Sequence, residues 1–154
     1  MDTSTKRAYA KLNLTLGVLY KRADGYHALD SIMQTVDLFD TVTVERARDI
    51  VVTSTGMLLP YDNTVRRAAE LYRALTGRSV QIRVIKRIPA EAGLGGGSAD
   101  AAATLNALQE LYGEVDEKTL LEIAAKVGAD VPFCLKGGTQ RAEGIGEVLT
   151  PIRG

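Results

Sequence analysis

The sequence has few of the residue types that build metal and disulfide sites. It contains one cysteine, Cys134, which excludes an intramolecular disulfide and a zinc site made of several cysteines. It contains one histidine, His27, which excludes a metal site made of several histidines and leaves no second histidine for a Ser-His-Asp triad. Cys134 lies in the apolar stretch "VPFCL", where a buried thiol is the default.

An excess of charge and long apolar runs are also lacking. The 19 basic and 19 acidic residues give a formal net charge of zero, which argues against broad electrostatic capture of nucleic acid but leaves room for a local basic pocket. No apolar run approaches the roughly 20 residues of a membrane-spanning helix. The first residues, "MDTSTKR", lack the apolar segment of a secretory signal. We expect a cytoplasmic protein without nucleic-acid or membrane partners.

With 154 residues, the chain is expected to form one domain. Strand patterns come first and helical patterns later, and strict β-α-β-α alternation is absent. This order favours a two-layer α+β architecture, a mixed or antiparallel sheet packed with helices, over a doubly wound parallel sheet. The patterns predict strands over 8–22, 31–38, 40–47, 49–55 and 79–89, a hairpin over 137–152, helices over 64–77, 98–113 and 116–128, and a short helix that Asp130 caps.

Two of these segments predict which side chains are buried. The first strand alternates, so Leu12 is expected on the apolar face and Lys11 on the polar face. For the helix over 64–77, Asn63 is the expected N-cap and Gly77 the expected stop. Its apolar face is expected to contain Val65, Ala68, Ala69, Tyr72 and Leu75.

The stretch "KRIPAEAGLGGGSADAA", residues 86–102, holds four glycines within five residues, ahead of an alanine-rich helix. It is not a Walker A loop, because Ser98 and Ala99 follow the last glycine where that motif requires lysine. It matches the dinucleotide fingerprint only in part, since Ser98 replaces the third glycine and a helix, not a strand, follows the loop helix.

A third phosphate motif needs no lysine in the loop. Successive backbone N–H groups of a glycine run at a helix N-terminus form an anion-binding nest, and glycine lets the backbone approach phosphate oxygens closely. Ser98 is placed to cap the helix and to donate to a phosphate. A flexible linker is the alternative, but four glycines directly before a strong helix are not linker composition.

The pattern P-x-x-x-G-L-G-G-G-S from Pro89 to Ser98 resembles the phosphate-binding motif of the GHMP kinase superfamily. Three further stretches, "AKLNLTLGV", "DGYH" and "GADVPFCL", follow the order of one member, an ATP-dependent kinase of isoprenoid precursor synthesis whose substrate carries cytidine diphosphate. The resemblance implies that ATP is bound by Asn63 and by the motif residues Pro89, Gly93, Leu94, Gly95, Gly96, Gly97, Ser98 and Ala99. Ala99 stands where this group usually repeats serine.

The resemblance also implies a catalytic pair. Asp130, in "GADVPF", would accept the proton of the substrate hydroxyl, and Lys11 would keep that aspartate charged and offset charge in the transition state. Without the resemblance, Asp130 is as readily a plain helix cap and Lys11 a solvated strand lysine. Mg²⁺ is expected to be held mainly through ATP phosphates, with no metal site built from protein side chains.

The substrate side follows from the same resemblance. Tyr26 would stack on the cytosine ring, His27 would hydrogen-bond it, and Asn13 would line the substrate pocket beside Asp130. Without the resemblance, Tyr26 and His27 form an ordinary surface loop. A GHMP kinase for another small alcohol and a nucleotide-binding module without catalysis are the alternatives.

The length departs from the family pattern, in which a second domain of similar size follows the final hairpin. We therefore expect residues 1–154 to be the N-terminal, ATP-binding half of such a kinase. Catalysis by positioning fails when half of the cleft is missing, so the chain alone is expected to turn over poorly. The face that would pack on the second domain is expected to be partly apolar and to promote self-association.

Overall fold

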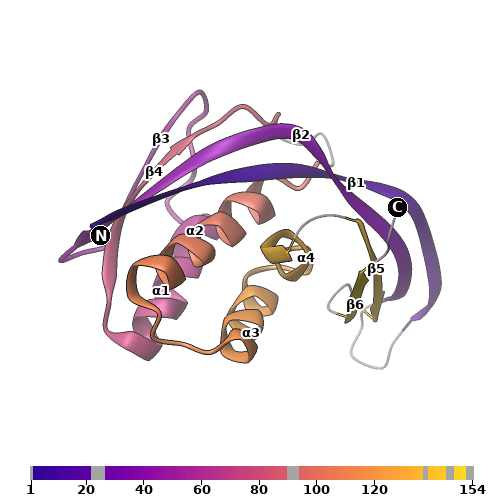
Figure 1. Cartoon of the computed structure of the whole chain (residues 1–154). Helices are drawn as coiled ribbons and strands as arrows, with labels where there is room; N and C mark the ends of the chain where they lie inside the picture. Colours follow the sequence, from indigo (N-terminus) through magenta and orange to yellow (C-terminus); the bar gives the residue numbers. More distant parts are fainter. Residues whose placement is uncertain (1, 22–26, 90–93, 137–138, 145–147, 152–154) are drawn as a thin grey trace.

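The computed structural model describes residues 2–21, 27–89, 94–136, 139–144 and 148–151, and the side chains of these residues except in 13–31 and 139–151. A bent sheet arches over a layer of helices that covers its concave face (Figure 1). The predicted α+β fold class is therefore confirmed. In chain order the elements are β1 (Thr3–Lys21), β2 (His27–Ala47), β3 (Val51–Thr55), α1 (Thr64–Thr76), β4 (Ser79–Ile85), α2 (Gly96–Tyr112), α3 (Glu117–Val127), α4 (Val131–Lys136), β5 (Thr139–Gly144) and β6 (Val148–Pro151).

The sheet is built around β2. Its strand order is β3-β4-β2-β5-β6, and β1 pairs with β2 outside this path. The N-terminal half of β2 pairs with β5 and the C-terminal half with β4, while β1 runs antiparallel along its length. Only β3 and β4 pair in parallel among the described strands, so the sheet is mixed.

One predicted break in the sheet is wrong. Residues 31–38 and 40–47 were expected as separate strands, but both belong to β2. Asp40 does not end a strand, because its carboxylate accepts hydrogen bonds from the N–H groups of Arg87 and Ile88 across the sheet. Strand β4 also ends earlier than expected, at Ile85, so residues 86–89 are free to lead into the glycine-rich stretch.

The strict alternation predicted for β1 fails where the site begins. The register between β1 and β2 shifts between Tyr9 and Lys11, and again between Asn13 and Thr15. Irregular pairing of this kind redirects the side chains that follow it. Lys11 is therefore buried with Ala10, and Leu12, predicted to be buried, is 43% exposed.

Helices α1 and α3 follow their predictions closely. Asn63 caps α1 by accepting a hydrogen bond from the N–H of Arg66, and Gly77 ends the helix with φ +74°. The predicted face of α1 is buried except for Leu75, which is 61% exposed because it lies beyond the part of the helix that contacts the core. The buried face of α3 is Leu120, Ile123, Ala124 and Val127, as predicted.

Helix α2 is the centre of the helical layer. It contacts the sheet strands β1 and β2 on one side and the helices α1, α3 and α4 on others. Small side chains allow this close packing from several directions: Ala99, Ala101, Ala102, Ala103 and Ala107 are all buried. The largest fully buried side chains of the core include Leu105 and Leu108 of α2 itself, together with Tyr72, Phe133 and Ile82.

Strand β4 offers a matched pair of isoleucines to test this core. Ile82 is fully buried and Ile85, three residues later, is 45% exposed. Ile82→Ala is expected to lower the free energy of unfolding by about 2–5 kcal/mol, because it leaves a cavity. Ile85→Ala is expected to cost less than about 1 kcal/mol. Urea unfolding of both variants checks this, and equal losses would contradict the described sheet orientation.

Candidate active site

The described end of the glycine-rich stretch packs directly onto β1. The carbonyl oxygen of Leu94 accepts a hydrogen bond from the N–H of Lys11 at 2.8 Å. Gly95 has φ +69°, and a Cβ at this position would lie 2.9 Å from Lys11 Cε. The backbone conformation and the lysine stem therefore both require glycine at position 95.

Gly95 also corrects the predicted helix start. Helix α2 begins at Gly96, two residues before the expected start, and its N-cap is Gly95 rather than Ser98. The first i→i−4 hydrogen bond runs from the N–H of Ala99 to the oxygen of Gly95. The N–H groups of Gly96, Gly97 and Ser98 lie ahead of that bond, so they form the free N-terminal edge of the helix. Because Gly95, in the left-handed conformation, is the N-cap, the helix starts closer along the chain to β4 than it would with Ser98 as the cap.

A pocket of about 230 Å³ opens at this helix start. Its apolar wall contains Met57, Leu59 and Ile88, and its floor contains the beginning of α2. The hydroxyl of Thr64 donates to the oxygen of Gly97 at 2.7 Å and so ties α1 to the loop. The predicted ATP-binding residues that line this pocket are Asn63, Pro89, Leu94, Gly95, Gly96 and Gly97.

Two of the predicted ATP-binding residues lie apart from this pocket lining. Ala99 is 2% exposed and faces a separate depression between β1, α2 and α4. Ser98 faces the segment before α4, since a Cβ on Gly128 would lie 3.9 Å from its hydroxyl oxygen. The serine hydroxyl therefore lies against the C-terminal end of α3.

Lys11 and Asp130 form the predicted pair. Lys11 Nζ lies 3.3 Å from Asp130 Oδ2, and the lysine side chain is 6% exposed while the aspartate side chain is 36% exposed. The oxygen of Asp130 accepts the N–H of Cys134, which opens the short helix α4. Lys11 therefore contacts both the loop, at Gly95, and the carboxylate, at Asp130.

Cys134 is partly buried beside this pair. Burial, and secondarily the negative charge of Asp130, raise the pKa of its thiol to about 12. A thiol with this pKa stays protonated at neutral pH, so Cys134 does not supply a nucleophile.

Several predicted residues fall outside what the structure describes. Gly93 and Tyr26 lie outside the described residues. Asn13 and His27 are described only as backbone in β1 and β2, where His27 pairs with Lys21. Their roles on the substrate side stay predictions.

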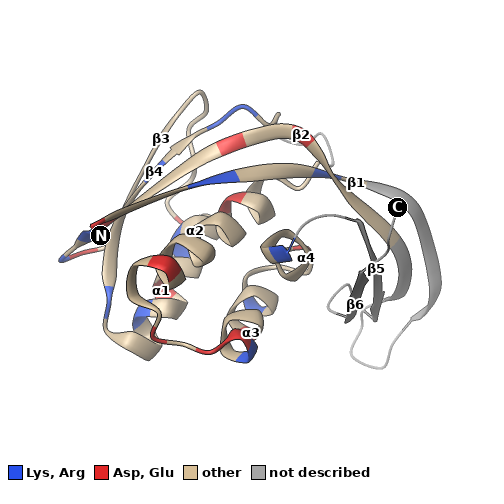
Figure 2. Cartoon of the chain, in the orientation of Figure 1, with Lys and Arg blue, Asp and Glu red and all other residues tan. Residues whose placement is uncertain are grey.

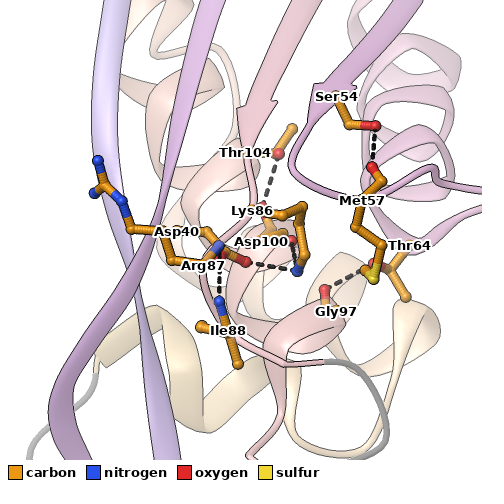
Figure 3. Close-up of polar contacts among 10 residues, drawn as sticks. All are labelled: Asp40, Ser54, Met57, Thr64, Lys86, Arg87, Ile88, Gly97, Asp100 and Thr104. Atoms are coloured by element: carbon orange, nitrogen blue, oxygen red, sulfur yellow. Dashed lines mark hydrogen bonds and ion pairs between the residues drawn. The ribbon is translucent and has the colours of Figure 1, made fainter.

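The pocket also holds a charged cluster that sequence reasoning missed in part. Lys86 Nζ lies 2.6 Å from Asp40 Oδ2 and 2.7 Å from Asp100 Oδ2 (Figure 3). Strand alternation in the sequence could have predicted this cluster, because it places Asp40 on the same buried face as Val42 and Val44. The same alternation places Lys86 on the face of Ile82 and Val84.

The three pKa values of this cluster are coupled. Burial and the nearby Asp40 raise the pKa of Asp100 to about 8, although Lys86 opposes the shift. Burial alone would raise the pKa of Asp40, but hydrogen bonds from Asp100 and from the backbone N–H groups of Ile88 and Arg87 bring it below its ordinary value. Burial alone would lower the pKa of Lys86, and its bonds to both carboxyl groups raise it instead. At pH 7, Lys86 therefore meets one carboxylate and one neutral carboxyl group.

Comparisons with known proteins agree with this geometry. The profile of the family described as "GHMP kinases N terminal domain" matches residues 63–138. The 4-diphosphocytidyl-2-C-methyl-D-erythritol kinase of Caldicellulosiruptor saccharolyticus is 47% identical over an alignment that covers 96% of this chain and 53% of the relative. Residues 63–138 therefore carry the N-terminal domain of the GHMP kinases. A second relative of that name, from Carboxydothermus hydrogenoformans, is 50% identical over 94% of this chain and 52% of its own length.

Solved structures show the same GHMP kinase fold. A crystal structure of 4-(cytidine 5'-diphospho)-2C-methyl-D-erythritol kinase superposes with a TM-score of 0.81 at 44% identity, over 97% of this chain and 55% of that one. The mevalonate kinase of Methanococcus jannaschii shares the fold at 14% identity with a TM-score of 0.72, over 98% and 56%. The chain spans about half the length of the curated relatives it matches.

No helix in the described part of the chain is long and apolar enough to cross a membrane. In the ribbon of Figure 2, positively and negatively charged residues are interspersed along the described helices and strands. The charges that matter for the site are therefore local ones.

Two glycines with the same backbone conformation test the contact between loop and lysine. Gly95 and Gly77 have φ +69° and +74°, but a Cβ on Gly77 would meet nothing within 4 Å. Gly77→Ala is expected to cost about 1–2 kcal/mol for the left-handed conformation alone. Gly95→Ala is expected to cost more, because Lys11 must also move. Chemical denaturation measures both, and equal costs would contradict the packing of Gly95 on Lys11.

Proposed function

We propose that the chain is the N-terminal, ATP-binding half of a cytoplasmic kinase of isoprenoid precursor synthesis. This kinase would phosphorylate the 2-hydroxyl of 4-diphosphocytidyl-2-C-methyl-D-erythritol. The observation that carries the proposal is the placement of Lys11, whose side chain contacts Gly95 in the loop and Asp130 beside it. The names of relatives at 43–50% identity support the substrate.

The pocket at the start of α2 is the proposed nucleotide site. The N–H groups of Gly96, Gly97 and Ser98 would donate to phosphate oxygens, and the positive end of the α2 dipole would favour them. The apolar wall at Met57, Leu59 and Ile88 would take the nucleobase. Bound ATP supplies the γ-phosphoryl group to be transferred.

Asp130 and Lys11 would carry the proton and the charge of the transfer. The oxygen of the substrate hydroxyl would form a bond to the γ-phosphorus of ATP while Asp130 accepts the hydroxyl proton. The bond between the γ-phosphorus and the oxygen that bridges it to the β-phosphate would break, and ADP would leave. Lys11 would orient Asp130 through their ion pair and offset negative charge on the transferring group. Burial of Lys11 strengthens both effects, because little water screens its ammonium group.

The substrate would lie on the side of the pair away from the nucleotide. Asn13, Tyr26 and His27 are the proposed contacts to the methylerythritol and cytosine groups.

In this proposal Mg²⁺ is held mainly through ATP phosphates. Among the described residues no group of three or more His, Cys, Asp and Glu side chains is arranged to hold a metal ion. Self-association through an apolar face remains a prediction.

Asp130→Asn separates chemistry from binding. The amide keeps the size of the carboxylate but cannot accept the proton, so kcat is expected to fall about 10²- to 10⁴-fold. ATP affinity is expected to stay within about twofold, because Asp130 lies outside the pocket lining. ADP formation reports kcat and isothermal titration with ATP reports affinity. Both are measured on the chain with the C-terminal half of the Carboxydothermus relative added in trans.

Asp116→Asn is the matched control. Asp116 caps α3 through Thr119, far from the loop, and asparagine caps helices equally well. This variant is expected to keep both kcat and ATP affinity. Wild-type turnover in Asp130→Asn would overturn the assignment of the base, and absence of ATP binding to the unaltered chain would overturn the nucleotide site.

A further inference from the structure

Asp40, Lys86 and Asp100 come from three elements that meet at the nucleotide pocket. Asp40 lies in β2, Lys86 directly follows β4, and Asp100 lies in the second turn of α2 (Figure 3). Their side chains are 0%, 4% and 2% exposed. Lys86 and Asp100 line the pocket. This cluster is separate from the pair formed by Lys11 and Asp130.

The cluster has one negative charge too many for its surroundings. Two carboxylates and one ammonium group leave a net charge of −1 in a buried position, which is costly without compensation. In addition, Asp100 Oδ1 is buried without a hydrogen-bond partner in the described part of the chain. One proton placed on Asp100 removes the excess charge. It also removes the repulsion between the two carboxyl groups, which both lie within 2.7 Å of the same Lys86 Nζ.

We propose that Asp40, Lys86 and Asp100 act as a proton-sharing clamp that positions both flanks of the nucleotide loop. The single proton, on Asp100, neutralises the excess negative charge so that the three side chains can stay in contact. The clamp deepens the proposed function and rests on it for its effect on nucleotide. Its effect on the loop stands without nucleotide.

The contacts of the cluster reach both sides of the loop. On the upstream side, Asp40 Oδ1 accepts from the N–H groups of Arg87 and Ile88 at 2.6 and 2.8 Å, and so fixes the chain that enters the loop. On the downstream side, a Cβ on Gly96 would lie 3.3 Å from Lys86 Nζ, so the ammonium group lies against the first turn of α2. The cluster thus holds described residues on both sides of the loop.

Among the residues that the structure describes, few titratable groups surround Asp100. Strand β2 presents Asp40, the end of β4 presents Lys86, and α4 presents Cys134, which Asp100 affects electrostatically. Helix α1 contributes Thr64 to the pocket lining, and threonine has no titratable side chain. Strand β1 contributes Lys11, which lies against Gly95, whereas Lys86 lies against the next residue, Gly96. Ionisation of Asp100 therefore acts chiefly on Asp40 and Lys86.

Deprotonation would loosen the clamp at a defined pH. The pKa of Asp100 near 8 means that the proton is present at pH 7 and absent at pH 9. Loss of the proton sets two carboxylates against each other and puts a negative charge in the wall of a pocket that has to accept an anion. If only the protonated form binds, its fraction falls about tenfold between pH 7 and pH 9, and apparent ATP affinity falls with it.

The proton on Asp100 also makes the stability of the folded state depend on pH. The pKa of the Asp100 carboxyl group is raised from its ordinary value of 3.8 to about 8 in the folded state. The folded state therefore binds more protons between these values, so this group lowers stability as pH rises from about 4 to about 8. Asp100→Asn is expected to remove that part of the slope.

Carbon-13 NMR of aspartate-labelled protein tests the clamp directly. The resonance that Asp100→Asn removes is assigned to Asp100, and its chemical shift is expected to titrate with a midpoint near 8. Amide signals of Arg87, Ile88 and Gly96 are expected to follow the same midpoint in the unaltered chain and to be independent of pH in Asp100→Asn. A midpoint near the ordinary aspartate value, or amide signals that do not follow Asp100, would overturn the proposal.

ATP titrations at pH 7 and pH 9 give the second arm. The unaltered chain and the Asp116→Asn control are expected to bind about tenfold more weakly at pH 9, and Asp100→Asn to bind equally at both values. Binding that loses affinity equally in all three proteins would overturn the link to nucleotide. Absence of ATP binding at any pH would overturn the proposed function, and the amide titrations would still decide whether the clamp exists.

Discussion

The arrangement of this domain depends on one buried ammonium group. Lys11 lies inside the protein because the pairing of β1 with β2 slips beside it, and its N–H and side chain then meet Leu94 and Gly95. Its charge is balanced by Asp130 at the start of α4. A single residue thus sets the distance between the loop that would hold phosphate and the carboxylate that would take a proton.

The second constraint is the position of α2. Alanines on several sides let the helix approach β1, β2 and its neighbouring helices at once, which fixes the direction of its free N–H groups. The cluster of Asp40, Lys86 and Asp100 then ties the first turns of α2 to the sheet. The glycine-rich stretch is therefore flanked by fixed elements: Asp40 accepts hydrogen bonds from Arg87 and Ile88 on one side, and the first turn of α2 lies on the other.

Much of this was predictable from the sequence, and the failures have physical causes. The Asn63 cap and apolar periodicity predicted α1 almost to the residue, and periodicity alone predicted α3 within one residue at each end. Tertiary contacts decided what local patterns could not. A slip in register buried Lys11 and exposed Leu12, and a left-handed Gly95 replaced Ser98 as the cap of α2.

The most direct test of the account is a crystal structure of the chain with a non-hydrolysable ATP analogue. The account predicts phosphate oxygens within hydrogen-bond distance of the N–H groups of Gly96 and Gly97, with the γ-phosphate beside Lys11. It also predicts that Lys11 still contacts Asp130. A nucleotide bound elsewhere on the surface, or a triphosphate turned away from Lys11, would contradict it.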